Sequence, residues 1–260
     1  MKDSREEWYD KDAKVAVTIV DVTSAAQELA RGHLAGPTST HFLTEALASV
    51  ALLGAEMSEK DETVILQMKC KGPLGGFNVE CTSGGMLRGY TERKVLEDFD
   101  GLGRPDARKV IGEAQYQVTR SVPGRILSQG ISTSIDGYLA GSLQRKACIR
   151  TEVAVSDEVE VLEARGIMVE DLPDAAGELK CCHVTDPKSL SVASRNILRQ
   201  LGLENAELRK TTPLKFACRC SPDRATQMLA ALSDEERKTL PPTIDITCHM
   251  CGKTFTVKTR

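Results

Sequence analysis

The feature that most restricts the fold of this chain is a set of four cysteines near its C-terminus. Cys218 and Cys220 form a CxC motif, Cys248 and Cys251 form a CxxC motif, and the 27 residues 221–247 separate the two motifs. Two close cysteine pairs, joined by a segment long enough to fold back, are the pattern of a tetrahedral Cys₄ zinc site. The sequence therefore predicts that these four thiolates bind one Zn²⁺ ion.

Residues 213–260 contain few apolar side chains for a segment that has to fold. They comprise two strand-like stretches, TIDITC and KTFTVK, and a helical stretch, DRATQMLAALSDEERKTL. So small a core seldom stabilises a domain without a disulfide or a metal. Zinc bound by four thiolates contributes about 10–16 kcal/mol to folding at neutral pH. We therefore predict a C-terminal zinc domain, residues 213–260, that is folded with the metal and unfolded without it.

The CxxC motif also has a redox interpretation, because thioredoxin-like proteins carry a CxxC pair between a strand and a helix. Here the motif precedes the strand-like run KTFTVK, and a second cysteine pair accompanies it. Both observations favour the metal site. Gly252 suits the tight turn of a metal-binding loop. His249, inside that loop, is interpreted as a solvated bystander because four thiolates already complete the coordination.

The CxC motif is unusual, because structural zinc ribbons mostly use two CxxC loops whose backbone N–H groups surround the sulfurs. A CxC motif cannot form the same loop, so we expect a less protected metal site. Arg219 lies between the two cysteines of this motif, and Lys253 follows the other motif. Cations there would favour thiolates and hence reactivity. Either residue alone is better interpreted as a surface charge.

The other five cysteines show no metal-binding spacing. Nine cysteines in all, and no apolar leader in MKDSREEWYDKDAKV, favour a reducing, cytoplasmic location over secretion. Cys70, Cys81 and Cys148 are expected to be buried free thiols. The adjacent Cys181 and Cys182 are interpreted as two separate thiols, because a disulfide between neighbouring residues is strained.

The composition is that of a globular protein and disfavours two classes of partner. The chain is 41% hydrophobic and 27% charged, which is ordinary for a globular fold. Its net charge of −3 and pI near 5.9 argue against general nucleic-acid binding, which favours basic surfaces. The longest apolar stretch, LTEALASVALLGAEM, contains Glu45 and is too short to span a bilayer. Neither nucleic acid nor a membrane is therefore an expected partner.

The pattern of elements predicts an α+β fold in three parts. Residues 1–165 are expected to form a domain with a mixed β-sheet and flanking helices, because strands and helices occur without strict alternation. Its predicted elements are helices at 40–57 (amphipathic) and near 134–146, and strands in ETVILQMKC, FNVECT, MLRGYTE, AQYQVTR, GRILSQGIS, IRTEVAV and VEVLEARGIMV. Residues 166–212 are expected to form a linker with a helix over Ser191–Leu203, followed by the helix-permissive stretch ENAELRKTTP.

Three stretches carry a resemblance to one known family. The CxC-x27-CxxC spacing at the C-terminus resembles that of the redox-regulated chaperones known as the 33-kDa heat-shock proteins. GPLGGFNVECTSGGMLRGY looks like the family's Gly-Pro-Leu-Gly turn, Gly72–Gly75, followed by its Arg-Gly-Tyr strand, Arg88–Tyr90. The helix HFLTEALASVALLGAEM is similar to the alanine-rich helix that precedes this strand-turn region in the family.

The resemblance implies a dormant, reduced, zinc-bound form and an oxidised form that holds unfolding client proteins without ATP. It therefore implies a chaperone rather than an enzyme, with a homodimer of the oxidised form as a further expectation. Zinc keeps the four sulfurs as thiolates, the form that peroxide or hypochlorous acid attacks. Each attacked sulfur has a partner two or three positions away, so Cys218–Cys220 and Cys248–Cys251 can each close a disulfide. Zinc would then leave, residues 213–260 would unfold, and the linker helix would expose apolar surface to clients.

Two other functions fit parts of the sequence. The C-terminal segment would suit a zinc-ribbon module that binds nucleic acid or a protein, but its acidic residues offset its basic ones. Phe255 is the only ring there expected to be exposed for stacking on a base. His33 and His41 would suit an enzyme site, but neither has a nucleophile or carboxylate partner at motif spacing. The chaperone remains the favoured function and the zinc-ribbon module the alternative.

Overall fold

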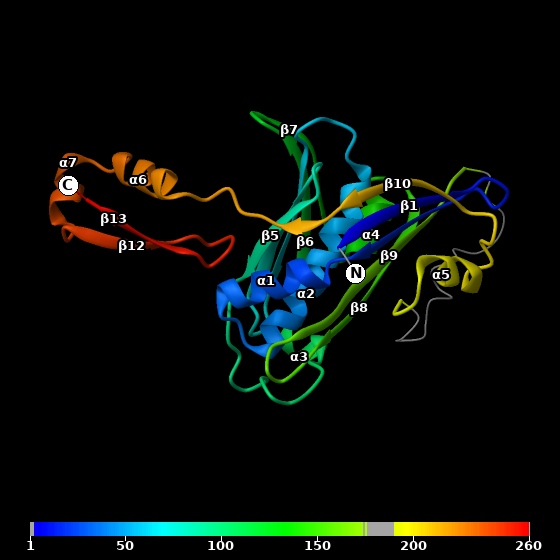
Figure 1. Ribbon diagram of the computed structural model, residues 1–260, viewed down its shortest axis with the longest axis horizontal. Coiled ribbons are helices and arrows are strands. Elements are labelled where there is room, and N and C mark those ends of the chain that lie inside the picture. The colour runs from blue at the N-terminus through cyan, green and yellow to red at the C-terminus, as the bar shows by residue number, and fades with distance from the viewer. Residues whose placement is uncertain (1–2, 174, 176–189, 260) are drawn as a thin grey trace.

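The computed structural model describes residues 3–173, 175 and 190–259 and shows an elongated molecule (Figure 1). A large body, residues 3–173 with 190–216, contains two sheets of five and six strands. A narrow C-terminal unit, residues 217–259, contains a third sheet of two strands. The architecture is α+β with mixed strand directions, which confirms the predicted fold class.

The five-stranded sheet brings together strands from both ends of the body. Its order is β10-β1-β2-β9-β8, and all neighbours are antiparallel. The strands are β1 (Ser4–Asp10), β2 (Val15–Asp21), β8 (Lys146–Val155), β9 (Val161–Asp171) and β10 (Glu207–Pro213). The helix-permissive interpretation of ENAELRKTTP is wrong, because β10 lies there and pairs with β1. Only Thr212 of β10 is buried, so backbone pairing rather than side-chain burial determines its conformation.

The six-stranded sheet contains the predicted strand-turn region. Its order is β11-β5-β4-β3-β6-β7, and only the β11–β5 pair is parallel. The strands are β3 (Thr63–Cys70), β4 (Gly76–Thr82), β5 (Met86–Thr91), β6 (Ala114–Val122), β7 (Arg125–Ser132) and β11 (Lys215–Phe216). Val64, Leu66 and Met68 are buried at alternate positions, which confirms the predicted half-buried strand β3.

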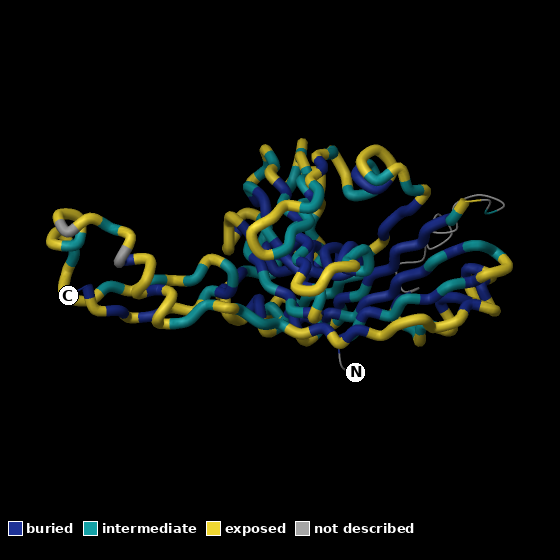
Figure 2. The backbone as a smooth tube through the Cα atoms, turned by 90° about the horizontal axis from the view of Figure 1, so that it is seen from above, coloured by how far each residue is buried: buried dark blue, intermediate teal, exposed yellow. Residues whose placement is uncertain are grey.

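Helix α2 (Pro37–Leu53) contacts strands of both sheets at the centre of the main core. Buried residues gather in the middle of the body (Figure 2). Every residue of α2 except Pro37 and Glu45 is buried, so the predicted helix is present but the prediction that it is amphipathic is wrong, because protein surrounds it on all sides. Pro37 starts the helix, where its missing N–H would have no partner in any case. Among the described residues, no helix is both long enough and apolar enough to cross a membrane.

Shorter helices complete the body. Helix α1 (Thr23–His33) packs beside α2 and contacts β5, β9 and β11. The remaining helical segments of the N-terminal part are η1 (Gly54–Glu56), α3 (Ala107–Val110) and α4 (Ile135–Gly141). The predicted helix near 134–146 is thus present as α4, which starts where the Ser134 side chain accepts a hydrogen bond from Gly137 N.

Within the predicted linker, helix α5 (Ser194–Gln200) packs on the face of the five-stranded sheet that is turned away from α2. Ile197, Leu198 and Leu201 are buried there in a second apolar cluster with strand residues that include Trp8. Arg165 on β9 donates hydrogen bonds to two backbone carbonyls just before α5, at 2.7 and 3.1 Å. The predicted linker helix is confirmed, although it is shorter than 191–203.

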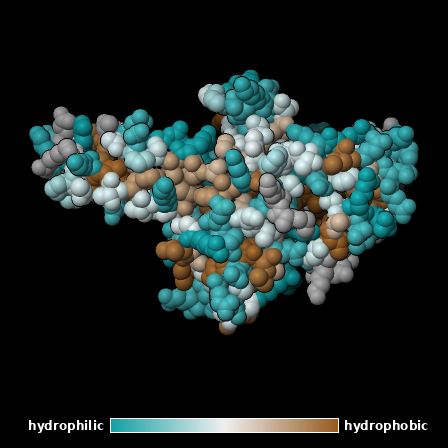
Figure 3. All heavy atoms as spheres, in the orientation of Figure 1, coloured by the Kyte–Doolittle hydropathy of each residue, from teal (hydrophilic) through white to brown (hydrophobic). Residues whose placement is uncertain are grey.

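The C-terminal unit has little apolar surface to bury. It contains α6 (Pro222–Ala230), α7 (Asp234–Thr239) and the hairpin of β12 (Thr243–Thr247) and β13 (Thr254–Lys258). In the described part of the unit, the apolar core consists of four buried side chains: Ala225, Leu229, Phe255 and Val257. On the face seen in Figure 3 the far end of the unit is largely hydrophilic around a small apolar area, and a weakly apolar area lies toward the body. The observed core is therefore as small as the sequence predicts.

Candidate metal centre

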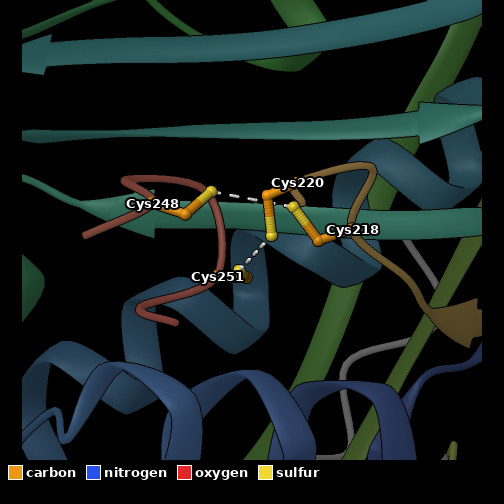
Figure 4. Close-up of side chains that lie close together, drawn as sticks. All are labelled: Cys218, Cys220, Cys248 and Cys251. Atoms are coloured by element: carbon orange, nitrogen blue, oxygen red, sulfur yellow. Dashed lines mark hydrogen bonds between the residues drawn. The ribbon is translucent and has the colours of Figure 1, made fainter. Parts of the chain in front are cut away.

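Four sulfur atoms from the two cysteine motifs lie together where the C-terminal unit meets the body (Figure 4). All four Sγ atoms are within 4.8 Å of one another. Cys218 Sγ lies 3.8 Å from Cys248 Sγ, and Cys220 Sγ lies 3.4 Å from Cys251 Sγ. Each of these contacts joins one motif to the other, so the four cysteines form one cluster rather than two separate pairs.

The CxxC motif occupies the tight loop between β12 and β13. Cys248 N–H donates to the Lys253 carbonyl at 2.9 Å, and Gly252 N–H donates to the Cys248 carbonyl at 2.8 Å. Gly252 has φ = +73°, a left-handed conformation that glycine adopts without strain. The predicted tight turn at this glycine is therefore present.

The CxC motif lies between β11 and α6. Ser221, directly after Cys220, is the N-cap of α6, and its side chain accepts a hydrogen bond from Arg224 N. Pro222 then starts the helix, which fixes the direction in which the chain leaves the motif. The capped helix on one side and the short strand on the other position both sulfurs toward the β12–β13 loop (Figure 4).

The geometry and electrostatics of the cluster suit a tetrahedral metal ion. Metal–sulfur bonds of about 2.3 Å in a tetrahedron place the sulfurs about 3.8 Å apart, close to the two shortest observed distances. Burial raises the pKa of the Cys251 thiol, and the three neighbouring sulfurs add to the increase. Burial also raises the pKa of the Cys220 thiol, and Cys218 and Cys248 add to the increase, although the hydrogen bond with Cys251 opposes it. Four thiolates this close repel one another unless a cation neutralises them. The cluster can therefore bind a thiophilic metal ion.

A cation from the body lies beside the cluster. Arg88 on β5 donates from Nη1 to Cys218 Sγ at 3.6 Å and from Nε to Glu80 on β4. Burial raises the pKa of the Cys218 thiol, but hydrogen bonds from Cys220 N–H and from Arg88 outweigh it and lower the pKa to about 7. Arg219, between the two cysteines of the CxC motif, has a half-exposed side chain that donates to Glu80 at 3.3 Å, in agreement with its interpretation as a surface charge.

All three residues of the Arg-Gly-Tyr stretch on β5 contact the cluster or its loop. Besides the Arg88–Cys218 contact, Gly89 N–H donates to the Met250 carbonyl at 3.2 Å. The Tyr90 ring meets the His249 ring edge-on, with centroids 5.6 Å apart. His249 is exposed and lies outside the four-sulfur cluster, as predicted for a solvated bystander, and its ring also contacts the body. The sequence singles out this stretch as a family motif, and the structure shows that it contacts the C-terminal unit.

The C-terminal end of α1 forms a second wall of the contact. Gly32 approaches the loop so closely that a Cβ atom there would lie 2.6 Å from the Cys251 carbonyl oxygen. His33 is buried, and its Nε2 donates to the Gly89 carbonyl at 2.8 Å. Burial lowers the pKa of His33, which favours the neutral ring. His33 therefore supports β5 where the loop lies against it.

Replacing Gly32 with alanine is expected to separate the loop from the body without weakening the body. In helix α1 alanine is preferred over glycine by about 0.5–1 kcal/mol, yet the new methyl group would overlap the Cys251 carbonyl. We expect Gly32→Ala to speed amide exchange at Gly89 by about tenfold or more, because its bond to Met250 is lost. Gly141→Ala, in α4 with no atom near the added methyl group, is the control. Equal protection of Gly89 in both variants would show that the contact tolerates the methyl group.

The remaining cysteines lie away from the cluster. Cys70 is a half-buried free thiol, and Cys81 is a buried one whose pKa burial raises to about 11. Cys148 on β8 is buried but disulfide-bonded, so the prediction of a free thiol is wrong at this position. Cys181 and Cys182 lie outside the described residues.

Phe255 and the two histidines do not have the positions that the alternative functions require, which are a zinc ribbon that binds nucleic acid and an enzyme. Phe255 is buried in the small core with Lys253 above its ring at 5.3 Å, so it offers no exposed face to a base. His41 pairs with Glu45 at 3.3 Å and packs edge-on against Phe42, whereas His33 donates to β5. The two histidines thus have separate structural contacts.

Comparison with known proteins gives the family. The sequence profile described as Hsp33 protein matches residues 3–258. The chain belongs to the Hsp33 family. A 33 kDa chaperonin of Thermus thermophilus is 28% identical, over 92% of this chain and 79% of its own length. The 33 kDa chaperonin of Oceanobacillus iheyensis is 26% identical, over 98% of this chain and 96% of its own.

The fold of the Hsp33 family is also found by structural comparison. The crystal structure of the 33 kDa chaperonin from Thermotoga maritima superposes with a TM-score of 0.86, at 19% identity, over 100% of this chain and 96% of that one. Membership of the Hsp33 family confirms the predicted family and the prediction of a chaperone rather than an enzyme. The four-cysteine cluster is the part of this Hsp33-family chain that can bind a metal.

Proposed function

We propose that this chain is a redox-regulated, ATP-independent holdase of the reducing cytoplasm. One Zn²⁺ ion bound by Cys218, Cys220, Cys248 and Cys251 keeps the reduced form dormant. Oxidation of the four cysteines releases the ion, unfolds the C-terminal unit and part of the linker, and allows unfolding client proteins to bind. The oxidised form is expected to associate as a homodimer.

The observation that carries the proposal is the position of the cluster. Four sulfurs within 4.8 Å of one another join the two halves of a unit that has only four buried apolar side chains in its described part. The same sulfurs and their loop contact β5 of the body through Arg88, Gly89 and Tyr90. A change at the sulfurs therefore reaches both the fold of the unit and its contact with the body.

The redox step uses only the cysteines and an oxidant such as peroxide. In each motif one thiolate attacks peroxide and becomes a sulfenic acid, which the second thiolate converts to a disulfide. As each disulfide forms, its two thiolates transfer two electrons to one peroxide molecule, which takes up two protons and leaves as two water molecules. We propose the pairs Cys218–Cys220 and Cys248–Cys251, because partners two or three residues apart stay close after the ion leaves. The sulfur contacts between the two motifs, Cys218–Cys248 at 3.8 Å and Cys220–Cys251 at 3.4 Å, depend on the folded unit, so they do not favour disulfides between the motifs once the unit unfolds.

The linker supplies apolar surface that unfolding can expose. Residues from α5 and the following turn are buried against Trp8 and the outer face of the five-stranded sheet. Between α5 and the C-terminal unit the chain is continuous through β10 and β11, so loss of the unit removes contacts at one end of the linker. An apolar sheet face of this kind is a surface that an unfolding client can cover.

The test combines metal content, thiol counting and client aggregation on one sample. Before peroxide, we expect one zinc per chain by mass spectrometry and no suppression of luciferase aggregation. After peroxide, we expect no zinc, four fewer reactive thiols and full suppression. Cys70→Ser, which removes a free thiol outside the cluster, should behave as the parent chain does. Zinc release without any suppression of aggregation would refute the chaperone mechanism.

Removing the arginine beside the cluster is expected to weaken zinc binding. Arg88→Met deletes the donor to Cys218 and leaves Glu80 with one cationic partner fewer. Loss of such an outer contact typically lowers metal affinity by about 10- to 100-fold, and we expect the lower end because Arg88 donates to one sulfur of four. Competition with a chromogenic chelator measures the change. Arg93→Met, at an exposed arginine just after β5, should leave the affinity unchanged.

A further inference from the structure

One edge of β5 is covered by the C-terminal part of the chain. On its other side β5 pairs with β4 over Leu87–Thr91. On the covered edge, Lys215 N–H donates to the Gly85 carbonyl at 3.0 Å, and Ala217 N–H donates to the Leu87 carbonyl at 3.1 Å. Gly89 N–H completes the edge by donating to Met250 in the metal-binding loop. This edge is therefore occupied by residues directly before the CxC motif and by the loop of the CxxC motif.

The segment that covers β5 has the properties of an added strand. Within residues 214–217, strand β11 runs parallel to β5, with Lys215 opposite Met86 and Phe216 opposite Leu87. Leu214 is 5% exposed and belongs to the main core, and Phe216 packs against the same core, whereas the Lys215 side chain is exposed. The edge thus accepts a backbone together with apolar side chains at alternate positions.

We propose that, in the activated form, the β5 edge binds an extended segment of unfolded polypeptide in place of residues 214–217. The proposal rests on the proposed function, because the edge is free only after the C-terminal unit has unfolded. The client segment would form main-chain hydrogen bonds with Gly85, Leu87 and Gly89, and its apolar side chains would replace Leu214 and Phe216. Residues 214–217 are then an autoinhibitory strand that occupies the client position in the dormant form.

An unfolded polypeptide is the occupant that this edge fits best. Backbone N–H and C=O groups are common to every sequence, so an open strand edge binds extended chains with little regard to their sequence. The short pattern of apolar, exposed and apolar residues in 214–216 occurs often in unfolded proteins. A holdase needs this kind of tolerant recognition. The surface lies on the six-stranded sheet and is distinct from the α5 face of the five-stranded sheet.

The edge is also built so that it opens when the cluster is lost. Strand β11 pairs over two residues only, and Cys218 follows it after Ala217. By contrast, β10 pairs with β1 over most of its length, so the chain can remain attached up to Pro213. The Gly89 carbonyl stays paired with His33 of the body, which keeps β5 in place after the loop has left.

Amide exchange at single residues of the full chain tests the proposal. In the reduced, zinc-loaded protein we expect protection at Gly89, Lys215 and Ala217, and after peroxide all three amides should exchange freely. When unfolded luciferase is then added, Gly89 should regain protection by about tenfold or more, while Lys215 and Ala217 stay unprotected. This pattern shows that the client has replaced the chain's own strand.

The other outcomes of this experiment are equally decisive. If luciferase is held while Gly89 exchanges freely, the edge proposal is wrong and the holdase function stands. If all three amides regain protection, the chain's own strand returns and the proposal is wrong. If Gly89 is protected without luciferase, increasingly so at higher protein concentration, the edge binds a second copy instead of a client. If the oxidised chain holds no luciferase, the proposed function fails and this proposal fails with it.

A pair of variants tests the autoinhibitory strand separately. Lys215→Pro removes the N–H that donates to Gly85, whereas Lys215→Ala removes only an exposed side chain. We expect Lys215→Pro to reach half-maximal holding of luciferase at a peroxide dose lower by about twofold or more, and Lys215→Ala to match the parent chain. Equal doses for the two variants would show that pairing of β11 does not close the edge.

Discussion

If the cluster holds the proposed zinc ion, we expect its removal from the reduced protein to unfold residues 217–259 and to leave the body folded. This is the largest effect we expect, because zinc bound by four thiolates contributes about 10 kcal/mol or more to folding. Four buried apolar side chains cannot replace a contribution of that size. A chelator together with a thiol reductant should therefore abolish amide protection in β12 and β13, while α2 keeps its protection.

The control for chelation is a variant that cannot complete the cluster. Cys248→Ser removes one ligand and should show the unfolded C-terminal unit without any chelator, whereas Cys70→Ser should remain fully protected until the chelator is added. Complete loss of zinc, verified by mass spectrometry, with β12 and β13 still protected would contradict the prediction. The unit would then be stable without its metal, and oxidation of the cysteines would have no structural consequence.

The cysteine cluster could be predicted from the sequence because the information is local. Two residues or fewer separate the cysteines within each motif, and Gly252 and Ser221 specify the turns next to them. The strands β12 and β13 alternate apolar and polar residues over five positions each. Spacing, turn residues and periodicity agree here, and such agreement makes a short segment predictable.

The contacts between the C-terminal unit and the body could not be predicted from spacing. Arg88 and Cys218 are 130 residues apart, and nothing near either of them indicates the other. Arg219 lies much closer in sequence to the sulfurs, yet in the structure its side chain donates to Glu80. Only the family resemblance of Arg88–Tyr90 signalled that this stretch has a role, and it did not say which.

Strands β1 and β10 were missed because their side chains do not show the usual pattern of a strand. In β1 the buried positions include Arg5, a residue type that is seldom buried without partners. Its guanidinium donates to the Ala51 carbonyl and to Glu7, which satisfies the charge inside the core. Strand β10 is almost wholly exposed and forms because β1 offers it a backbone edge. Both strands form because they pair with strands distant in the sequence, and local propensity does not indicate such pairing.

The ion pair between Glu62 and Arg120 should be the most sensitive polar contact of the body. Glu62 is fully buried, accepts from Arg120 at 2.6 Å, and accepts from the Ser58 and Glu59 N–H groups at 3.0 Å each. Burial raises the pKa of Glu62, but these hydrogen bonds outweigh it and lower the pKa below its ordinary value of 4.5. Glu62→Gln removes the carboxylate partner of Arg120, and we expect it to lower the free energy of unfolding by about 3 kcal/mol at neutral pH.

Urea unfolding followed by the fluorescence of Trp8, the single tryptophan, measures this loss in the body alone. Because the folded-state pKa of Glu62 is lowered, its contribution is complete above about pH 4.5 and disappears as the pH falls through the lowered pKa. The difference in the free energy of unfolding between the parent chain and Glu62→Gln should therefore become smaller in acid. Glu113→Gln removes a carboxylate whose ion pair with Lys71 is about four-fifths exposed, so its effect should stay within about 0.5 kcal/mol. If the difference between the parent chain and Glu62→Gln grows in acid, or if the two variants lower the free energy of unfolding equally, the buried carboxylate does not stabilise the body as an anion.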